Sequence, residues 1–204
     1  MEHSPAGGSR SCPAGGGRGA STFPETGGQY SHAAAWLGHA FARLGEGDEA
    51  ARIFSFLNPA SHASTRTEAN HYRVEPYAVA ADIASVDPHT GRGGWTWYTG
   101  AAAWTWRLGV EAILGLKMRC GQLAIDPALP KGWGGFKAEI RTSGGTLNIA
   151  VKDPGRIGHG RVEIKVDGKA HSGPVALPGD GKMHKVEVRL RPISARRPKA
   201  AARI

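Results

Sequence analysis

The chain has 204 residues, of which 40% are hydrophobic and 21% are charged, and its formal net charge at pH 7 is +9. This composition is typical of a globular protein with a buried core, and it excludes fibrous and coiled-coil proteins. No apolar run reaches the ~18–20 residues of a membrane-spanning helix, and the N-terminus lacks the basic-then-apolar order of a secretion signal. We therefore expect a soluble, cytoplasmic protein without a membrane segment.

Residues 1–21 consist mainly of Gly, Ser, Pro, Arg and Ala and show no hydrophobic periodicity. Such a segment buries too little apolar surface to offset the entropy that it would lose on ordering, so we predict that it is disordered. Cys12 lies in this segment and Cys120 lies far beyond it, and neither is part of a CxxC or Cys/His pattern. We expect two free thiols and no metal site.

A helical pattern follows. Apolar residues recur at spacings of three and four over residues 33–44, and Gly45 comes next as a candidate helix end. Asp48 is a candidate N-cap for a second helix, which ends at Asn58-Pro59 because proline cannot continue it. Two antiparallel helices joined by a short turn are the simplest interpretation. A third helix is predicted over residues 101–116, and its apolar residues on nearly every side predict that it is buried.

Roughly forty residues connect the second helix to the third, whereas most connections have a median of ~4–6 residues and long ordered loops are usually functional. The connection ends at Thr99-Gly100, where the free backbone N–H groups of a helix start and a hydroxyl favour an anion. Plain N-capping by Thr99 explains this residue equally well. His32 follows Gly27-Gly28, and local sequence favours a core histidine over a phosphate ligand.

The connection and the third helix also contain a cluster of aromatic residues. Aromatic rings stack on sugar rings as readily as they fill a core, and core packing is their more common fate. We therefore expect most of these rings to be packed in the core. The cluster comprises Trp95, Trp97, Tyr98, Trp104 and Trp106.

Beyond residue 121 the pattern changes to short alternating runs separated by Gly and Pro, which predicts β-strands. Asp167-Gly168 is a tight hairpin signal between two of these runs. We predict a small antiparallel, sandwich-like β domain over residues 121–192, and hence an α+β fold. The predicted strands include residues 146–151, 161–166 and 186–190.

The end of the chain is basic, with six Lys or Arg and no aromatic residue over residues 189–203. Binding of single-stranded nucleic acids relies on aromatic stacking platforms. We therefore predict a disordered, solvated tail over residues 193–204 and no specific nucleic-acid partner.

Five segments of the chain, taken together, resemble the C-terminal region of bacterial cyclic β-1,2-glucan synthases. They are also similar, more distantly, to the cellobiose and chitobiose phosphorylases of glycoside hydrolase family 94. The resemblance covers residues 23–190. It implies that residues 22–120 form the C-terminal part of an (α/α)6 barrel, followed by the β domain. The segments are GGQYSHAAAW (27–36), LNPASHA (57–63), YRVEPYAVAADI (72–83), GRGGWTWYTGAAAW (91–104) and LAIDPALPKGWGGF (123–136).

The resemblance also implies a reaction, which is the inverting phosphorolysis of a β-glucosidic bond or its reverse. The expected partners are a β-glucan oligosaccharide and inorganic phosphate as co-substrate, with no other cofactor. His32, Thr99 and Gly100 lie where this family contacts phosphate, and Glu75 lies in a motif that lines the sugar subsites.

The family's general acid is an aspartate that precedes the GGQYSH motif, and no motif of this chain matches it. Asp48, Asp82 and Asp87 lie outside such a motif, so we assign no catalytic residue. We expect a C-terminal fragment that is inactive alone and whose barrel an upstream polypeptide completes. The main alternative is a non-catalytic carbohydrate-binding module, which the aromatic cluster and the β-rich end suggest. Nucleic-acid binding through the tail and a product that does not fold stably are the remaining alternatives.

Overall fold

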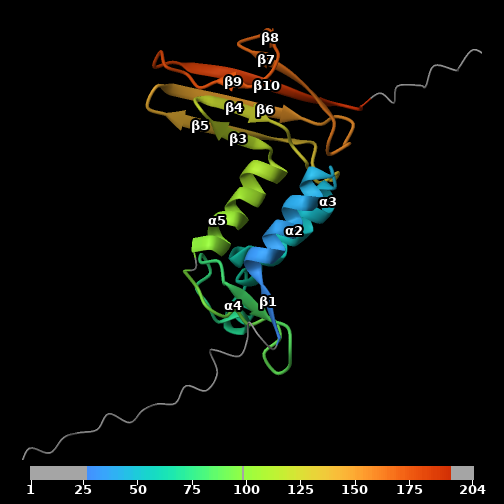
Figure 1. Cartoon of the computed structure of the whole chain (residues 1–204), viewed down its shortest axis with the longest axis vertical. Coiled ribbons are helices and arrows are strands. Elements are labelled where there is room, and N and C mark those ends of the chain that lie inside the picture. The colour runs from blue at the N-terminus through green and yellow to red at the C-terminus, as the bar shows by residue number, and fades with distance from the viewer. Residues whose placement is uncertain (1–26, 98, 194–204) are drawn as a thin grey trace, which may run out of the picture.

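The computed structural model describes residues 27–97 and 99–193. Figure 1 shows two β-sheets at one end of the molecule, helices in the middle, and a short β ladder at the opposite end. The expected α+β fold is confirmed. The disorder predicted for residues 1–21 lies outside the described residues, as does that of the predicted tail except for its first residue, Ile193.

Two of the predicted helices form an antiparallel pair, α2 (Ser31–Arg43) and α3 (Gly47–Leu57). The third predicted helix begins as α5 (Thr99–Arg107) and continues as one stretch of π-helix, η2 (Leu108–Ile113). The helix ends before residue 116 because Gly115 adopts a positive φ and strand β3 (Leu116–Arg119) begins immediately after it. The three segments share a small core of Ala35, Ala42, Ala50, Ile53, Leu57, Leu108, Ala112 and Ile113.

The predicted N-cap role of Asp48 is wrong. Helix α3 begins at Gly47, and no side chain caps it. Gly47 lies against the main chain of the β domain, where a Cβ would be 2.2 Å from the carbonyl oxygen of Leu129. The Asp48 carboxylate instead accepts a hydrogen bond from the Lys131 backbone N–H at 2.9 Å. Asp48 therefore connects the helices to the β domain.

The long connection between α3 and α5 has structure of its own: η1 (Pro59–His62), α4 (Arg66–Tyr72) and β2 (Asp82–Ala84). Helix α4 has a capping box. The Thr65 hydroxyl accepts the Glu68 N–H at 3.2 Å, and the Glu68 carboxylate accepts the Thr65 N–H at 2.9 Å. The spacing Thr-x-x-Glu is the sequence signal that indicates this helix start.

The β domain is a sandwich of two sheets with strand orders β5-β6-β10-β7-β8 and β3-β4-β9. Its core lies between the sheets and includes Leu123, Ile149 and Val188, none of which is more than 2% exposed. The domain comprises β3, β4 (Gln122–Ile125), β5 (Gly135–Thr142), β6 (Gly145–Lys152), β7 (Arg161–Val166), β8 (Lys169–His171), β9 (Val175–Ala176) and β10 (Met183–Arg191).

The expectation of a purely antiparallel β domain is wrong for one pair of strands, because β10 runs parallel to β6. The chain leaves β7 through the tight hairpin to β8, joins the other sheet as β9, and returns as β10 between β6 and β7. Parallel neighbours require such a crossover connection. The hairpin itself is confirmed: Asp167 and Gly168 have φ values of 49° and 80°, as a type I′ turn requires.

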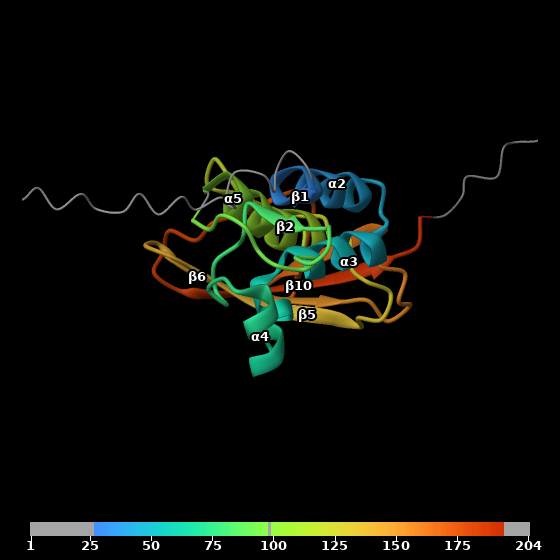
Figure 2. The same ribbon diagram turned by 90° about the horizontal axis from the view of Figure 1, so that it is seen from below.

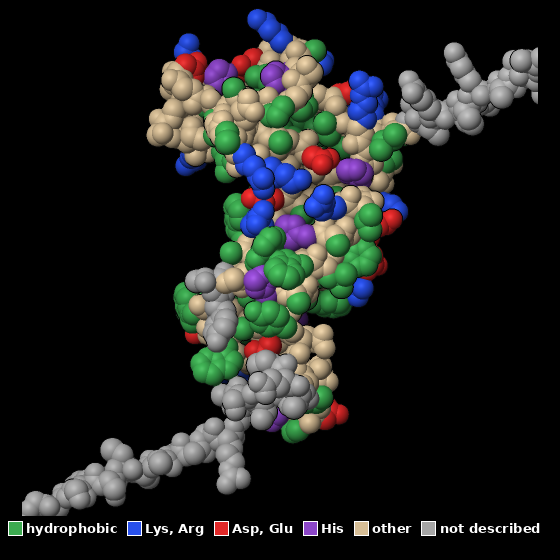
Figure 3. All heavy atoms as spheres, viewed as in Figure 1, with side chains coloured by type: hydrophobic (Ala, Val, Ile, Leu, Met, Phe, Trp, Pro, Cys, Tyr) green, Lys and Arg blue, Asp and Glu red, His purple; other side chains and the backbone are tan. Residues whose placement is uncertain are grey.

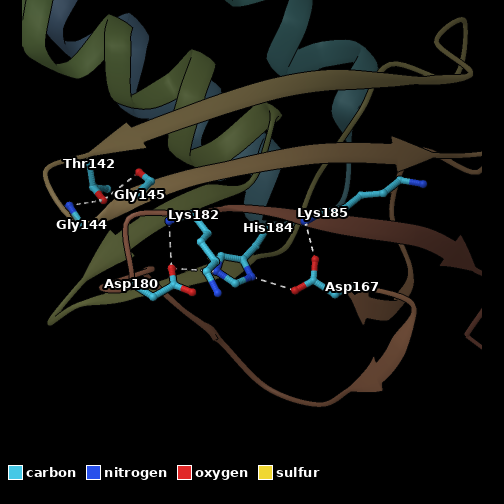
Figure 4. Close-up of polar contacts among 8 residues, drawn as sticks. All are labelled: Thr142, Gly144, Gly145, Asp167, Asp180, Lys182, His184 and Lys185. Carbon is cyan, nitrogen blue, oxygen red and sulfur yellow. Dashed lines mark hydrogen bonds and ion pairs between the residues drawn. The ribbon is translucent and has the colours of Figure 1, made fainter.

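A histidine that lies between two aspartates connects strand β10 to two loops of the β domain (Figure 4). His184, on β10, lies with Nδ1 2.7 Å from Asp167 in the β7–β8 turn and with Nε2 3.1 Å from Asp180 in the loop before β10. The hydrogen bond with Asp167 contributes most to raising the pKa of His184, and Asp180 adds to it. The same bonds lower the pKa of each carboxyl group.

These shifts predict how the stability of the protein depends on pH. Because the pKa of His184 is raised on folding, the protonated imidazole stabilises the folded protein fully below about pH 6.5. This stabilisation is lost as pH rises through the folded-state pKa. Because the pKa values of Asp167 and Asp180 are lowered on folding, the two carboxylates stabilise the folded protein above about pH 4. This stabilisation is lost at lower pH. In urea unfolding, H184Q should therefore lose most stability between about pH 4 and 6.5. A loss of equal size at every pH would contradict this assignment.

Candidate functional site

The candidate site lies at the end of the helices that is farther from the β-sheets. Helices α2 and α5 both start there and run toward the sheets (Figure 1). Strand β1 (Gly28–Tyr30) leads directly into α2 and pairs with β2, with Tyr30 opposite Asp82. Figure 2 shows this ladder beside the two helices. The Ser31 N–H donates to the Ala81 carbonyl at 2.8 Å, so the start of α2 is fixed to β2.

The structure brings together two of the predicted phosphate-site residues. His32 lies in the first turn of α2 and Gly100 in the first turn of α5. A Cβ on Gly100 would lie 3.2 Å from Nδ1 of His32, so the imidazole is packed against the backbone of α5. Thr99 is the first residue of α5, and its side chain is outside the described part of the structure. The first backbone N–H groups of a helix have no partner within the helix, and here they lie beside an imidazole ring.

Aromatic rings surround His32 on several sides. Trp36 contacts it edge to face with the ring centroids 4.7 Å apart, Trp104 stacks on it at 5.9 Å, and Tyr30 lies at 5.8 Å. The Nε2 atom of His32 is shielded from solvent and has no hydrogen-bond partner among the described residues. A satisfied core histidine would have one. The ring is therefore held in place by packing while a polar nitrogen remains without a partner.

Trp104 links His32 to a line of charged residues along α5 and η2. The Arg107 guanidinium carbon lies 4.4 Å from the centre of a Trp104 ring, a cation–π distance. Glu111 accepts the Arg107 Nε–H at 2.9 Å. His39 meets Trp104 edge to face at 5.4 Å. A continuous series of contacts thus connects the His32 ring through Trp104 and Arg107 to Glu111.

These charged groups line a polar pocket of about 570 Å³ between the helices and the sheets. Figure 3 shows basic, acidic and histidine side chains gathered in this region, and hydrophobic side chains exposed over the helices. Burial is the largest influence on the pKa of His39 and lowers it; the Trp104 backbone comes next and raises it, and Arg107 lowers it by less. Within the described residues, no group of three or more His, Cys, Asp or Glu could hold a metal ion.

The predicted sugar-side residue, Glu75, lies in the long connection next to two exposed rings. Its carboxylate accepts the indole N–H of Trp97 at 3.1 Å, and Tyr77 meets Trp97 edge to face at 6.3 Å. A hydrogen bond from its own backbone N–H lowers the pKa of Glu75 most, and the Trp97 indole lowers it further. Trp97 is 70% exposed and Tyr77 is 73% exposed. Trp97 also has a φ of 64°, a left-handed conformation that is uncommon for a bulky residue.

The expectation that the aromatic cluster is mostly core is wrong for Trp95, Trp97 and Trp106, which are 51%, 70% and 55% exposed. The reason for Trp95 is local. Its carbonyl accepts the Ala81 N–H at 2.6 Å, and the Gly94 N–H donates to the Asp82 carbonyl at 2.9 Å. These residues therefore add to the edge of β2, which leaves the Trp95 ring at the surface.

Asp82 is the least expected polar residue of the site, because it is only 1% exposed. Burial raises the pKa of its carboxyl group, and the Trp95 backbone offsets only part of this effect. Neither carboxylate oxygen makes a regular hydrogen bond with a described residue. A Cβ on Gly94 would lie 2.4 Å from Oδ1 of Asp82, so only glycine fits above the carboxyl group. No sequence pattern indicates this burial.

The chain matches two known families of carbohydrate-active proteins. Residues 19–115 match "Glycosyl hydrolase 94 superfamily, catalytic domain", and residues 116–179 match "Glycosyl hydrolase family 65, C-terminal domain". The resemblance found in the sequence is thus confirmed.

None of the helices among the described residues is long and apolar enough to span a membrane.

Three characterised relatives are similar to the chain. It is 50% identical over 140 residues to cyclic beta-(1,2)-glucan synthase NdvB of Rhizobium meliloti (strain 1021). The aligned residues cover 69% of this chain and 5% of that protein. It is 32% identical over 154 residues to the N,N'-diacetylchitobiose phosphorylase of Vibrio furnissii, covering 70% of this chain and 18% of that enzyme. The Vibrio proteolyticus enzyme is 29% identical over 138 residues, with coverages of 67% and 17%. The chain therefore spans a small part of each relative.

The packing around His32 predicts different effects for two neighbouring tryptophans. W104A removes the ring between His32 and Arg107 and should lower the free energy of unfolding by about 2 kcal/mol, less than the ~3–5 of a fully buried tryptophan. It should also shift and broaden the NMR signal of the His32 ring. W106A, in the same helix but 55% exposed, is the matched control and should do neither. Equal effects of the two substitutions would show that Trp104 does not position His32.

The burial of Asp82 predicts a second dependence of stability on pH. Its folded-state pKa lies above the ordinary value, so its ionisation favours unfolding increasingly as pH rises above about 4. D82N cannot ionise, and its free energy of unfolding should fall less between about pH 4 and 7 than that of the unchanged protein. D87N, at an exposed aspartate, should keep the original slope. Parallel pH profiles for D82N and the unchanged protein would contradict a buried, hard-to-ionise carboxyl group.

Proposed function

Because residues 19–115 belong to the glycosyl hydrolase 94 superfamily, we propose that this chain supplies the phosphate-holding half of an active site that cleaves β-glucosidic bonds by inverting phosphorolysis. The observation that carries the proposal is the meeting of His32 with Gly100 at the shared starting end of α2 and α5. Thr99, beside Gly100, completes the proposed phosphate site. Inorganic phosphate is the proposed co-substrate, and no further cofactor is invoked.

The proposed reaction requires phosphate to be held beside the sugar. A phosphate oxygen forms a bond to the anomeric carbon while the bond from that carbon to the glycosidic oxygen breaks, and a general acid protonates the departing oxygen. The backbone N–H groups at the start of α5 supply donors and the positive end of a helix dipole. The His32 ring is packed beside them with Nδ1 on the side of the α5 backbone, and from this nitrogen it can donate a further hydrogen bond. Such prearranged donors orient the nucleophile without reorganisation during the reaction.

On the sugar side, we propose that Glu75 accepts hydrogen bonds from sugar hydroxyls and that Trp97 and Tyr77 offer exposed aromatic faces. Support comes from the hydrogen bond between Glu75 and the Trp97 indole, which holds a carboxylate beside a ring. The substrate that we propose is a β-1,2-linked glucan oligosaccharide, because identity to the glucan synthase is 50% and identity to the chitobiose phosphorylases is 32% and 29%.

We assign the general acid to no residue of this chain. Asp82 has its carboxyl group enclosed beneath Gly94, and both carboxylate oxygens are shielded from solvent in the described part of the structure. We propose that the acid and the rest of an (α/α)6 barrel come from an upstream polypeptide. The exposed hydrophobic residues of the helices support a covering of this kind: Trp36 is 53% exposed, Phe56 is 52% exposed, and Trp106 is 55% exposed.

The test uses a longer polypeptide that contains residues 22–190 together with a complete family 94 catalytic domain. Given β-1,2-gluco-oligosaccharides and phosphate, it should release glucose 1-phosphate. H32Q should raise the KM for phosphate at least about tenfold, the cost of one lost hydrogen bond to a charged ligand, while the KM for the oligosaccharide stays the same. H171Q, at an exposed histidine on β8, is the control and should change neither. Absence of glucose 1-phosphate, or equal effects of the two variants, would refute the proposal.

The isolated chain separates this proposal from a carbohydrate-binding module. We expect little or no turnover by the chain alone, because general acid catalysis is worth ~10²–10⁴-fold. Titration with β-1,2-glucan, followed by tryptophan fluorescence, tests the alternative. Saturable binding that is indifferent to phosphate and to H32Q would favour a module, because the exposed rings would then act without the phosphate site.

A further inference from the structure

The outer face of the five-stranded sheet carries a concentration of positive charge that the proposed reaction does not use. We call the outward-pointing side chains of β5, β6, β7 and β10 the basic sheet face. These strands alternate, with one set of side chains in the core between the sheets and the other set in solvent. The outward set contains eight basic and three acidic residues, a net charge of +5.

Ion pairs account for only part of this charge. Each of the three carboxylates pairs with one basic residue: Glu139 with Arg141, Glu187 with Lys185 at 3.0 Å, and Glu163 with Arg191 at 2.9 Å. The other five basic side chains of the face have no ion-pair partner within the described residues. They are Lys137, Lys152, Arg161, Lys165 and Arg189.

The strand register sets two pairs of like charges opposite each other, and it also sets Arg189 opposite Glu163 and Glu187 opposite Lys165. Arg189 on β10 is aligned with Lys152 on β6, and Arg191 on β10 is aligned with Arg161 on β7. Like charges in directly opposed positions destabilise a sheet. The positive charge around Glu163 lowers the pKa of its carboxyl group. The hydrogen bond with Arg191 lowers this pKa most, and the charges of Arg189 and Arg161 lower it further. The face thus keeps an excess of five positive charges that its own carboxylates do not neutralise, and an anionic partner would neutralise it.

The shape of the face limits the kind of partner. Along β10 the charged positions span about 20 Å, and the four strands of the face span about 15 Å. A shallow hollow of about 250 Å³ is lined by four basic side chains, Lys152, Lys165, Arg189 and Arg191, and by the paired carboxylates Glu163 and Glu187. It is large enough for one phosphate ester. No outward residue of these strands is aromatic. The face therefore lacks the stacking platforms of single-strand nucleic-acid sites.

We propose that the basic sheet face binds the anionic headgroups of a membrane surface. A broad, shallow array of unpaired Lys and Arg fits such a surface by charge complementarity, with no deep groove or aromatic ring required. The sequence after β10 extends the positive charge, with Arg196, Arg197 and Lys199 following Ile193, which is 72% exposed. The face belongs to the β domain and the His32 site lies at the far end of the helices (Figure 1). The proposal is therefore independent of the proposed reaction.

The test is sedimentation of the 204-residue chain with lipid vesicles. Vesicles of phosphatidylcholine with about 30% phosphatidylserine should bind the chain at low ionic strength, and about 0.5 M salt should release it. Vesicles of phosphatidylcholine alone should not bind. Each basic residue near an anionic surface is worth about fivefold in partitioning, so K152Q/R161Q/R189Q should weaken binding by about 100-fold. Its melting temperature should change little, because none of these three exposed side chains forms an ion pair within the described residues.

Two variants with the same change in net charge complete the test. R66Q/R119Q/K131Q removes three exposed basic residues outside the face and should keep most of the binding. R196Q/R197Q/K199Q removes three basic residues of the tail sequence and should weaken binding less than the face variant does. Equal losses in all three variants would indicate an effect of net charge alone, and loss only in the tail variant would assign binding to the tail; either result overturns the proposal. Tighter binding to duplex DNA than to the anionic vesicles would also overturn it.

Discussion

The close contact between α2 and α5 brings together the residues of the proposed phosphate site. Two glycines make it possible. A Cβ on Gly38 would lie 2.6 Å from a methyl group of Leu108, the first residue of η2, which continues α5. A Cβ on Gly100 would lie 3.2 Å from the His32 ring. Glycine inside a helix costs about 1 kcal/mol relative to alanine. In return, α2 and α5 approach so closely that the His32 imidazole on α2 contacts the backbone of α5. A larger residue at either position would move His32 away from the first turn of α5.

The β domain holds this helix pair at the opposite end. Helix α3 is fixed by the hydrogen bond from Lys131 to Asp48, and the end of η2 is fixed by the bond from the Ala128 N–H to the Ile113 carbonyl at 3.0 Å. Asp153, fully buried, accepts two backbone N–H groups of the loop whose Gly158 carbonyl then binds the Leu129 N–H at 2.8 Å. The helices are thus anchored at the sheets, whereas among the described residues their other ends contact the short β1–β2 ladder, η1 and the neighbouring loops. That end is where the proposed barrel would pack.

Sequence patterns predicted the local elements well. The helical spacing over residues 33–44 and the Asp167-Gly168 turn both rest on interactions between residues near in sequence, and both are confirmed. The juxtaposition of His32 and Gly100 could be expected only from the family resemblance, because no periodicity relates positions so distant in the chain. For the same reason, the parallel pairing of β10 with β6 was missed: it follows from a crossover whose path is set by the packing of the whole sandwich.

Burial was the least predictable property, and Asp82 shows why this matters for the site. Strand β2 is the frame that joins the two proposed halves. On one edge it pairs with β1, which leads into His32, and on the other it binds Gly94 and Trp95, which lead toward Trp97. The phosphate side and the sugar side are therefore positioned by one strand of three residues. An enclosed carboxyl group in that strand, beneath a glycine that leaves no space for another side chain, means that a change in its ionisation would disturb both halves together.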